Sequence, residues 1–340
     1  MKEFIKSFPK VELHTHLNGG IREETLNKWH KDKEVTKYID SFLSPKTSSQ
    51  KAMENCFKSF DLIYEATTTL ERIKQLTKEV LEDYDNENCI IVEIRTSPRK
   101  LEGHSILDYY NTVIESFQEY LNNRNKNTPF YPYLLFSINR SKLEIGKETI
   151  DIANELRKQN NFVKGIELSG NPYKGDINKI IELMNYSKLL NMPFTMHIAE
   201  KIDDDEMIKL IECKPSRMGH GTYVNNEGID LMNKYNIDCE ICLTSNMVSR
   251  SIDNYNNHPI LKNKNYKGKL FFCCDDRGLF RTCLTNELLH AINNYYNNLS
   301  ETEQKDLIKK LTIDGINASF LDEKVKTELK EYIEKIQIEK

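Results

Sequence analysis

The sequence predicts an α/β fold, a TIM-type (β/α)8 barrel with a helical insertion after the first strand and extra C-terminal helices. Its 340 residues suit one such barrel with additions, because barrels of this kind run to about 250 residues and tolerate insertions. Short apolar runs recur along the chain, with helical segments between them. Most of these runs are apolar on both faces, which is typical of parallel strands covered by helices. We therefore expect a single domain over residues 1–340.

Eight segments rich in β-branched and aromatic residues are the expected strands. They span residues 11–17, 89–97, 131–139, 162–170, 194–200, 217–224, 237–245 and 269–276. Between them, apolar residues recur near helical spacing, for example in 70–84, 106–121 and 177–190. Strands that alternate with helices in this way favour a closed barrel over an open sheet.

Two regions depart from this alternation. About forty residues, 22–66, separate the first expected strand from the helix expected at 70–84, which is too many for one connection. We expect an inserted helical subdomain there, placed as a lid, which includes SPKTSS at 44–49. The charged segment from about residue 300 to 340 is expected to form one or two helices outside the barrel.

The composition allows a sizeable core under a charged surface, since 39% of residues are apolar and 29% are charged. The formal net charge of −4 gives no general attraction to nucleic-acid backbones or anionic membranes. The N-terminal segment lacks an apolar targeting region, and no run of eighteen apolar residues occurs. We expect a soluble cytoplasmic protein with a small-molecule partner and no nucleic-acid or membrane partner.

The chain has eight cysteines, and two pairs of them resemble metal or redox motifs. Cys239 and Cys242 form a CxxC, and Cys273 is followed directly by Cys274. All four lie in expected strands, where residues three apart point to opposite faces. Cys239 and Cys242 are therefore not expected to bind one metal ion, and buried reduced thiols are the better interpretation.

The strongest functional signal is a set of histidines and carboxylates at the expected C-terminal ends of strands, which converge at one mouth of a barrel. His14 and His16 are two residues apart, so both side chains leave the same face of the first strand. The full set is His14, His16, His197, His220, Asp275 and Asp276. Three imidazoles and a carboxylate, with a position left for water, make an open catalytic zinc site, although iron or manganese would accept the same ligands.

A single histidine in a strand is more often a packed or surface residue than a ligand. We keep that interpretation for His30, His104, His258 and His290, and an HxH motif alone would support either. The coincidence of HxH, HxxE, GHG and DD in four elements favours the metal site. Glu200 lies three residues after His197, so it leaves the other face and stands at the lip of the mouth, where an acid–base group is useful.

Five motifs resemble the adenosine/AMP deaminase superfamily, in the right order and over nearly the whole chain. They are PKVELHTHLNGGI (9–21), MHIAE (196–200), MGHGT (218–222), CLTSN (242–246) and CCDD (273–276). The other zinc deaminase architecture has HxE followed by PCxxC. This chain has HxxE, and its CxxC lacks the preceding proline, so that alternative is rejected.

The resemblance implies one zinc ion and a monomeric hydrolase that removes an amino group from a purine. The implied metal ligands are His14, His16, His197 and Asp275. Glu200 is implied to protonate purine N1, and His220 to orient and stabilise the hydroxide, with Asp275 counted among the catalytic residues. Asp276 is implied to contact purine N7, and the backbone of Gly170 is implied to contact purine N3. His16 and Glu200 are also implied to contact the substrate.

Details are similar to the adenosine deaminase-like, or N6-methyl-AMP deaminase, branch. Asn18 stands where ordinary adenosine deaminases usually have Asp, and a neutral amide would not repel a 5′-phosphate. RTSPR at the end of the second strand offers hydroxyls from Thr96 and Ser97, then Pro98, then a bidentate fork from Arg99. At the end of the eighth expected strand the chain has DDRG at 275–278, where ordinary adenosine deaminases usually have DDP. A loop role for Arg99 and a turn role for Asn18 remain the alternatives.

Tyr64 in the insertion and Asn139 after the third strand are further candidates for substrate contact, although other branch members tend to have His and Asp there. The reaction expected from the resemblance converts N6-methyl-AMP to IMP and methylamine. The alternatives are an adenosine deaminase, then an adenine deaminase, and, in a different class, a non-catalytic purine-binding protein.

Overall fold

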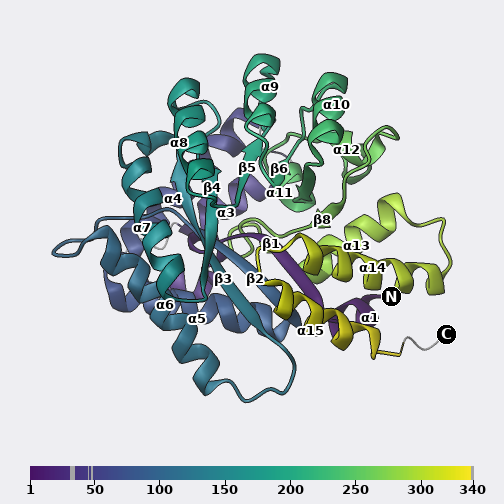
Figure 1. The fold of residues 1–340 in the computed structure, drawn as a ribbon, viewed down its shortest axis with the longest axis horizontal. Coiled ribbons are helices and arrows are strands. Elements are labelled where there is room, and N and C mark those ends of the chain that lie inside the picture. Colours follow the sequence, from purple (N-terminus) through teal and green to yellow (C-terminus); the bar gives the residue numbers. More distant parts are fainter. Residues whose placement is uncertain (31–34, 45, 47–48, 338–340) are drawn as a thin grey trace.

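The computed structural model describes residues 1–30, 35–44, 46 and 49–337, and it confirms the predicted barrel (Figure 1). Eight parallel strands form one sheet in the order β1 to β8, with helices around its outside. The strands are β1 (Lys10–His16), β2 (Cys89–Thr96), β3 (Tyr131–Asn139), β4 (Val163–Ser169), β5 (Phe194–Ile198), β6 (Arg217–His220), β7 (Asp238–Ile241) and β8 (Leu270–Phe272).

The sheet closes between its first and last strands through a short bridge. Thr15 in β1 pairs in parallel with Asp275, which lies beyond the end of β8. The Asp275 N–H donates to the His14 carbonyl at 2.8 Å, and the His16 N–H donates to the Asp275 carbonyl at 3.1 Å. The backbone of one predicted site residue therefore also completes the barrel.

One helix precedes the first strand, and the others lie between successive strands and beyond the last strand. They are α1 (Lys2–Ser7), α5 (Leu70–Asn86), α6 (Ile106–Asn123), α7 (Gly146–Gln159), α8 (Ile177–Leu189), α9 (Asp204–Glu212), α10 (Asn226–Tyr235), α11 (Leu243–Val248), α12 (Pro259–Lys262), α13 (Leu284–Tyr295), α14 (Glu301–Ala318) and α15 (Glu323–Glu334), with 3-10 turns η1 (Asn18–Gly20), η2 (Arg140–Ile145) and η3 (Tyr255–Asn257). Among the described residues, none of these helices is both long and apolar enough to cross a membrane.

The predicted insertion after β1 forms the helices α2 (Glu23–Trp29), α3 (Val35–Leu43) and α4 (Ser49–Ala66). Arginines from three loops after strands bond to it. Arg99 Nη1 donates to the Tyr64 carbonyl at 3.1 Å, and Arg250 Nη2 donates to the Ser44 carbonyl at 2.8 Å. Arg281 Nη1 donates to a carboxylate oxygen of α3 at 2.7 Å. The insertion is thus held at the end of the barrel where the strands finish.

The C-terminal helices α14 and α15 pack beside α1, on the side of the molecule where both chain ends lie (Figure 1). Gly315 in α14 lies against Val11 of β1, where an added Cβ would come within 2.9 Å of the valine side chain. Arg217 Nη1 donates to the Ala318 carbonyl at 2.6 Å. These helices therefore sit against the barrel opposite to the mouth that holds the histidines.

The last four strands are shorter than predicted. The expected ranges 194–200, 217–224, 237–245 and 269–276 end instead at residues 198, 220, 241 and 272. The backbone turns into the left-handed region at Ala199 (φ 59°), His220 (φ 67°) and Asp275 (φ 60°), which ends the extended conformation. After β7 the chain enters α11. The prediction was wrong there because apolar residues continue past each strand end.

The cysteines are buried thiols outside disulfides in the described chain, apart from Cys56 and Cys283, which are half-buried. One premise of the prediction was wrong, because Cys242 lies beyond β7 and precedes α11 rather than lying in the strand. Burial raises the pKa of the Cys239 and Cys242 thiols well above the usual value. A buried, protonated thiol is a poor metal ligand.

Charged side chains fill much of the barrel interior, which the sequence analysis did not predict. They are Glu12, Glu93, Arg95, Glu167, Arg217 and Glu240, each at most 1% exposed. Arg217 Nη2 in β6 donates to Glu93 Oε1 in β2 at 2.6 Å, and Arg95 Nη2 in β2 donates to Glu240 Oε2 in β7 at 3.2 Å. Since these pairs join strands that are not neighbours, they cross the interior. Pairing is what makes burial of these charges tolerable.

Candidate active site

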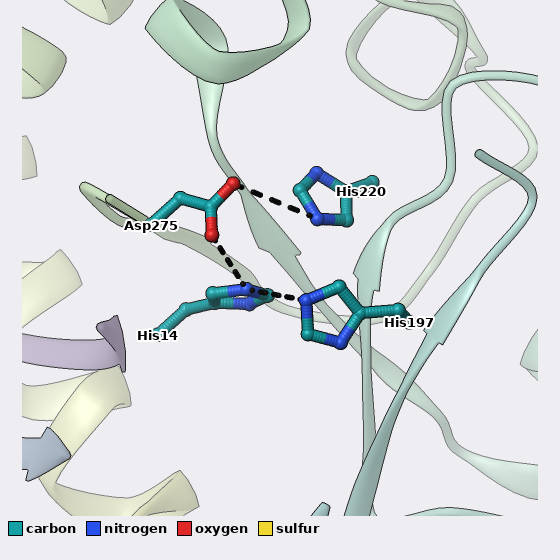
Figure 2. Close-up of side chains that lie close together, drawn as sticks. All are labelled: His14, His197, His220 and Asp275. Atoms are coloured by element: carbon teal, nitrogen blue, oxygen red, sulfur yellow. Dashed lines mark hydrogen bonds and ion pairs between the residues drawn. The ribbon is translucent and has the colours of Figure 1, made fainter. Parts of the chain in front are cut away.

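Four strand ends bring three histidines and an aspartate together at the mouth of the barrel (Figure 2). One ligand atom from each of His14, His197, His220 and Asp275 lies within 4.8 Å of the others. His14 Nε2 is 3.1 Å from His197 Nε2 and 3.5 Å from Asp275 Oδ1. All four residues are buried. The group has the size and the donor atoms of a metal site.

His16 lies next to this group. Its Nε2 lies 3.2 Å from His197 Nε2 and 3.3 Å from Asp275 Oδ1, and its side chain is 18% exposed. The structure thus places the four predicted ligands, His14, His16, His197 and Asp275, around one point, with His220 beside them.

Hydrogen bonds behind the rings indicate which nitrogens of His14 and His197 carry lone pairs. His14 Nδ1 is 2.7 Å from Glu240 Oε2, and His197 Nδ1 is 2.8 Å from the Leu168 carbonyl oxygen. Both partners are acceptors, so in the neutral ring, the form that binds a metal ion, each Nδ1 donates and each Nε2 presents a lone pair. Two lone pairs 3.1 Å apart repel each other, and a cation between them removes the repulsion. The donor set therefore fits a bound metal ion.

The charged interior supports His14 from below. Burial alone would raise the pKa of Glu240, but Arg95 and Arg217 outweigh it and keep that pKa well below the usual value. The Glu240 carboxylate accepts from His14 on one oxygen and from Thr195 Oγ1 on the other, at 2.9 Å. A fixed anionic acceptor of this kind orients a metal-binding imidazole.

Local backbone geometry aims the side chains at the centre. His220 and Asp275 have φ values of 67° and 60°, which non-glycine residues adopt only where the surroundings enforce it. Gly219 in β6 lies so close to His14 that an added Cβ would come within 2.6 Å of Cε1. The GHG motif therefore provides one residue that turns the chain and one that makes room for a neighbouring ring.

Glu200 stands at the lip, as predicted from its spacing. Its Oε1 is 3.7 Å from His220 Nε2, and in the described structure its buried Oε2 has no hydrogen-bond partner. Burial raises the pKa of Glu200. A carboxyl with a raised pKa and an unpaired oxygen is suited to exchange a proton with a ligand.

Asp276 also presents an unpaired oxygen. It is 5% exposed, and its Oδ1 has no partner among the described residues. Burial, with the neighbouring Asp275 charge, raises the pKa of Asp276 well above its usual range, which favours the protonated, hydrogen-donating form. Gly19 makes room for it, because an added Cβ would lie 1.7 Å from that oxygen. Gly170 has φ 101°, a conformation that glycine adopts without strain.

The predicted phosphate-contacting residues lie at and beyond the ends of β1 and β2, and Asn139, a predicted substrate contact, ends β3. Asn18 is buried, and its Nδ2 donates to Thr96 Oγ1 at 3.4 Å, at the limit for such a bond. Thr96 Oγ1 is also 2.7 Å from the hydroxyl of Tyr109. Asn139 Nδ2 donates to Ser97 Oγ at 3.5 Å. Polar groups from three strands thus adjoin one another.

Arg99 follows the buried Pro98 and binds the insertion. Its guanidinium donates to the Tyr64 carbonyl at 3.1 Å and to the Thr67 carbonyl at 3.0 Å, and it lies 4.9 Å from the centre of the Tyr64 ring. Its Nε is buried without a partner in the described chain. The structure therefore gives Arg99 an anchoring role toward α4, in addition to any contact with a ligand.

Several residues around the site escaped the sequence analysis. Tyr109 in α6 reaches Thr96, and Asn246 in α11 reaches His220. Asn246 closes the CLTSN motif, so its position was available, but nothing in the motif gave its partner. The four histidines set aside lie outside the group of ligand atoms. His258 is fully buried, His290 stacks on Tyr255, His30 pairs with Glu65 at 3.2 Å, and His104 is exposed.

Comparison with known proteins places this geometry in a family. The adenosine deaminase family profile matches residues 9–336. The N6-mAMP deaminase of Arabidopsis thaliana is 32% identical, over 96% of this chain and 97% of that protein. The human N6-methyl-AMP deaminase is 28% identical, over 96% and 93% of the two chains.

Solved structures agree with this assignment. The crystal structure of the Arabidopsis N6-mAMP deaminase has a TM-score of 0.88 and 32% identity, covering 98% of this chain and all of that one. Arabidopsis ADAL complexed with IMP has a TM-score of 0.87 and 31% identity, covering 98% of each chain. This chain belongs to the adenosine deaminase family and is a hydrolase that acts on a purine C–N bond.

Proposed function

We propose that this enzyme hydrolyses the C6–N6 bond of an adenine nucleotide, converting N6-methyl-AMP to IMP and methylamine, with one zinc ion. The main support is the arrangement at the mouth. A histidine and aspartate group suited to a cation lies beside two carboxyl groups, the half-buried Glu200 and the buried Asp276, that each keep a buried oxygen unpaired within the described structure. Relatives named N6-methyl-AMP deaminase and a similar structure complexed with IMP support the nucleotide substrate.

The ligands of the ion are assigned to His14, His16, His197 and Asp275. Nitrogen and carboxylate donors in a four-ligand set, with room for water, suit zinc. When bound, zinc lowers the pKa of water to about 7 and so supplies a nucleophile at neutral pH.

The remaining roles follow from hydrogen-bonding capacity. Glu200, whose pKa is raised by burial, gives its proton to purine N1 and makes C6 more electrophilic. Purine N7 is an acceptor, and the protonated Asp276 donates to it. The Gly170 N–H is assigned to N3. These contacts hold the ring in the plane required for attack at C6.

The preference for a nucleotide is assigned to the polar groups at the ends of β1 and β2. Asn18 is neutral, so no carboxylate opposes a 5′-phosphate, and its amide can donate to the phosphate together with the hydroxyls of Thr96 and Ser97. Arg99 adds positive charge, but some of its N–H groups already donate to the carbonyls of Tyr64 and Thr67. Tyr64 and Asn139 complete the proposed lining, and the insertion acts as the lid.

The test is a side-by-side assay of N6-methyl-AMP, AMP, adenosine and adenine, with metal analysis of the purified protein. We expect one zinc per chain and a kcat/KM for N6-methyl-AMP at least about tenfold above that for adenosine, a difference of about 1.4 kcal/mol. A higher kcat/KM for adenosine would replace the proposal with a nucleoside deaminase. Absence of turnover with bound purine would indicate a binding protein.

A further inference from the structure

The three buried histidines of the metal group differ in what stands behind their rings. His14 and His197 have oxygen acceptors behind Nδ1, at 2.7 Å and 2.8 Å. His220 instead has the side-chain amide of Asn246 behind Nδ1, with Nδ2 at 3.1 Å. Since the hydrogen bond on one ring nitrogen determines which nitrogen holds the proton, this difference divides the histidines into two classes.

Asn246 is held firmly in place. It is 2% exposed in α11. Its backbone N–H donates to the Cys242 carbonyl at 2.9 Å, and its carbonyl accepts from the Ser251 N–H at 3.0 Å. The backbone of Asn246 is therefore fixed, and of its side-chain amide Nδ2 bonds to His220 while Oδ1 is buried without a hydrogen-bond partner in the described structure.

The front of the His220 ring favours the same proton position. Its Nε2 faces two carboxylate oxygens, Glu200 Oε1 at 3.7 Å and Asp275 Oδ2 at 3.9 Å. Carboxylates accept hydrogen bonds, so a proton on Nε2 suits this face. Nδ1 then holds the lone pair and needs a donor, which the Nδ2 of Asn246 supplies. Both sides of the ring therefore agree on one tautomer.

We propose that Asn246 is a positioning residue that keeps His220 in the Nε2–H tautomer, so that His220 donates a hydrogen bond into the site and does not bind the metal ion. The inference rests on the proposed function for its effect on turnover. It accounts for the presence of five candidate ligands around a site that needs four: His14 and His197 direct lone pairs at the centre, whereas His220 directs an N–H.

Two substitutions separate the role of the amide from its bulk. Asn246→Asp keeps the shape but replaces the donor with an anionic acceptor, which draws a proton to Nδ1, so that the ring is either in the Nδ1–H tautomer or cationic. Asn246→Leu removes the hydrogen bond without reversing it. Asn160→Asp is the matched control, because it adds the same charge at an asparagine that precedes β4 at the opposite end of the barrel, where its Oδ1 accepts from the Val163 N–H at 3.1 Å.

The tautomer is measured directly by ¹⁵N NMR of histidine-labelled protein, with and without zinc. We expect the His220 Nδ1 signal of the unmodified chain to be that of a non-protonated nitrogen, and that of Asn246→Asp to be that of a protonated nitrogen. In the zinc-loaded protein we expect kcat to fall about tenfold in Asn246→Leu and at least about a hundredfold in Asn246→Asp, because a wrong tautomer disables a catalytic histidine. KM, zinc content and the Asn160→Asp control should change less than about threefold.

A proton on Nδ1 of His220 in the unmodified chain would overturn the proposal, and so would an Asn246→Asp variant at least as active as Asn246→Leu. If Asn246→Asp fails to fold, the tautomer of the unmodified chain and the kcat of Asn246→Leu still decide the question. Failure of the proposed function is distinguishable, because it appears as a changed substrate preference of the unmodified chain, while the NMR measurement needs no substrate.

Discussion

The two halves of the barrel are built differently. Strands β1 to β4 span seven to nine residues, whereas β5 to β8 span three to five. The second half ends its strands early, with left-handed residues at Ala199, His220 and Asp275. These interruptions place most of the acid–base and metal-binding groups, while β2, β3 and β4 of the first half end in the neutral polar residues Thr96, Asn139 and Ser169.

This difference suggests a division of labour. The regular first half provides a stable wall and the contacts assigned to the phosphate, through Asn18, Thr96 and Ser97. In the irregular second half the strands are interrupted by left-handed residues, and the side chains of His197 and its neighbours converge on one point. Backbone strain at such left-handed residues is common at catalytic sites. β1 belongs to both halves, because it contributes His14 and His16 and pairs with Asp275. Substitutions in the second half should therefore damage chemistry, and those in the first half should change substrate preference.

The largest effect is expected from loss of the metal ion. Dialysis against a chelator, or His197→Ala, should reduce kcat by more than the roughly hundredfold typical of one acid–base group, because the nucleophile is lost. Added zinc should restore the dialysed protein but not the variant. The measurements are turnover and metal content, with His290→Ala as the control, since His290 stacks on Tyr255 away from the group. A fully active, zinc-bound His197→Ala would remove that residue from the ligand set.

The next effect concerns Glu200. Glu200→Gln should keep zinc and the fold, yet lower kcat by at least about a hundredfold, because the amide cannot deliver the proton to N1. Steady-state kinetics and metal analysis check this, and the exposed Glu212→Gln in α9 serves as the control. Near-normal turnover would mean that another group supplies the proton.

The sequence predicted the first half of the fold better than the second. The third strand was predicted with its observed bounds, 131–139, and the first within one residue, because apolar content falls where these strands end. In the second half, Cys242, Cys273 and Cys274 remain buried beyond the strands, so hydrophobicity gave no sign of the turn. The left-handed backbone conformation of a residue such as Asp275 cannot be predicted from the pattern of apolar residues.

The sequence predicted where the candidate site residues lie, but not the groups that support them. Spacing placed His14, His16 and Glu200, because side-chain direction alternates along a strand. The partners behind them come from distant strands, as Glu240 does for His14, at 2.7 Å. Such pairs depend on the closure and stagger of the barrel, which local spacing does not contain. For the same reason the two classes of histidine were not foreseen.

The first half is tested by Asn18→Asp, with a smaller expected effect. A carboxylate at this position would repel a 5′-phosphate, so kcat/KM for N6-methyl-AMP should fall at least about tenfold, a change of about 1.4 kcal/mol. The value for adenosine should stay within about threefold, and it serves as the internal control. Equal losses on both substrates would show that Asn18 acts on the site as a whole, and the proposed division of labour would fail.

The smallest effect should distinguish the two roles of Arg99. Arg99→Lys keeps the positive charge but loses the planar fork that reaches the Tyr64 and Thr67 carbonyls. If Arg99 acts mainly by charge, Arg99→Lys should retain turnover of N6-methyl-AMP within about threefold, while Arg99→Ala should lose about tenfold more on the nucleotide than on adenosine. If it acts mainly as an anchor for α4, both variants should lose turnover of both substrates to a similar extent, together with thermal stability. We expect the first pattern in kcat/KM and a modest loss of stability in both variants, because the charge and the anchor are separate functions of one side chain.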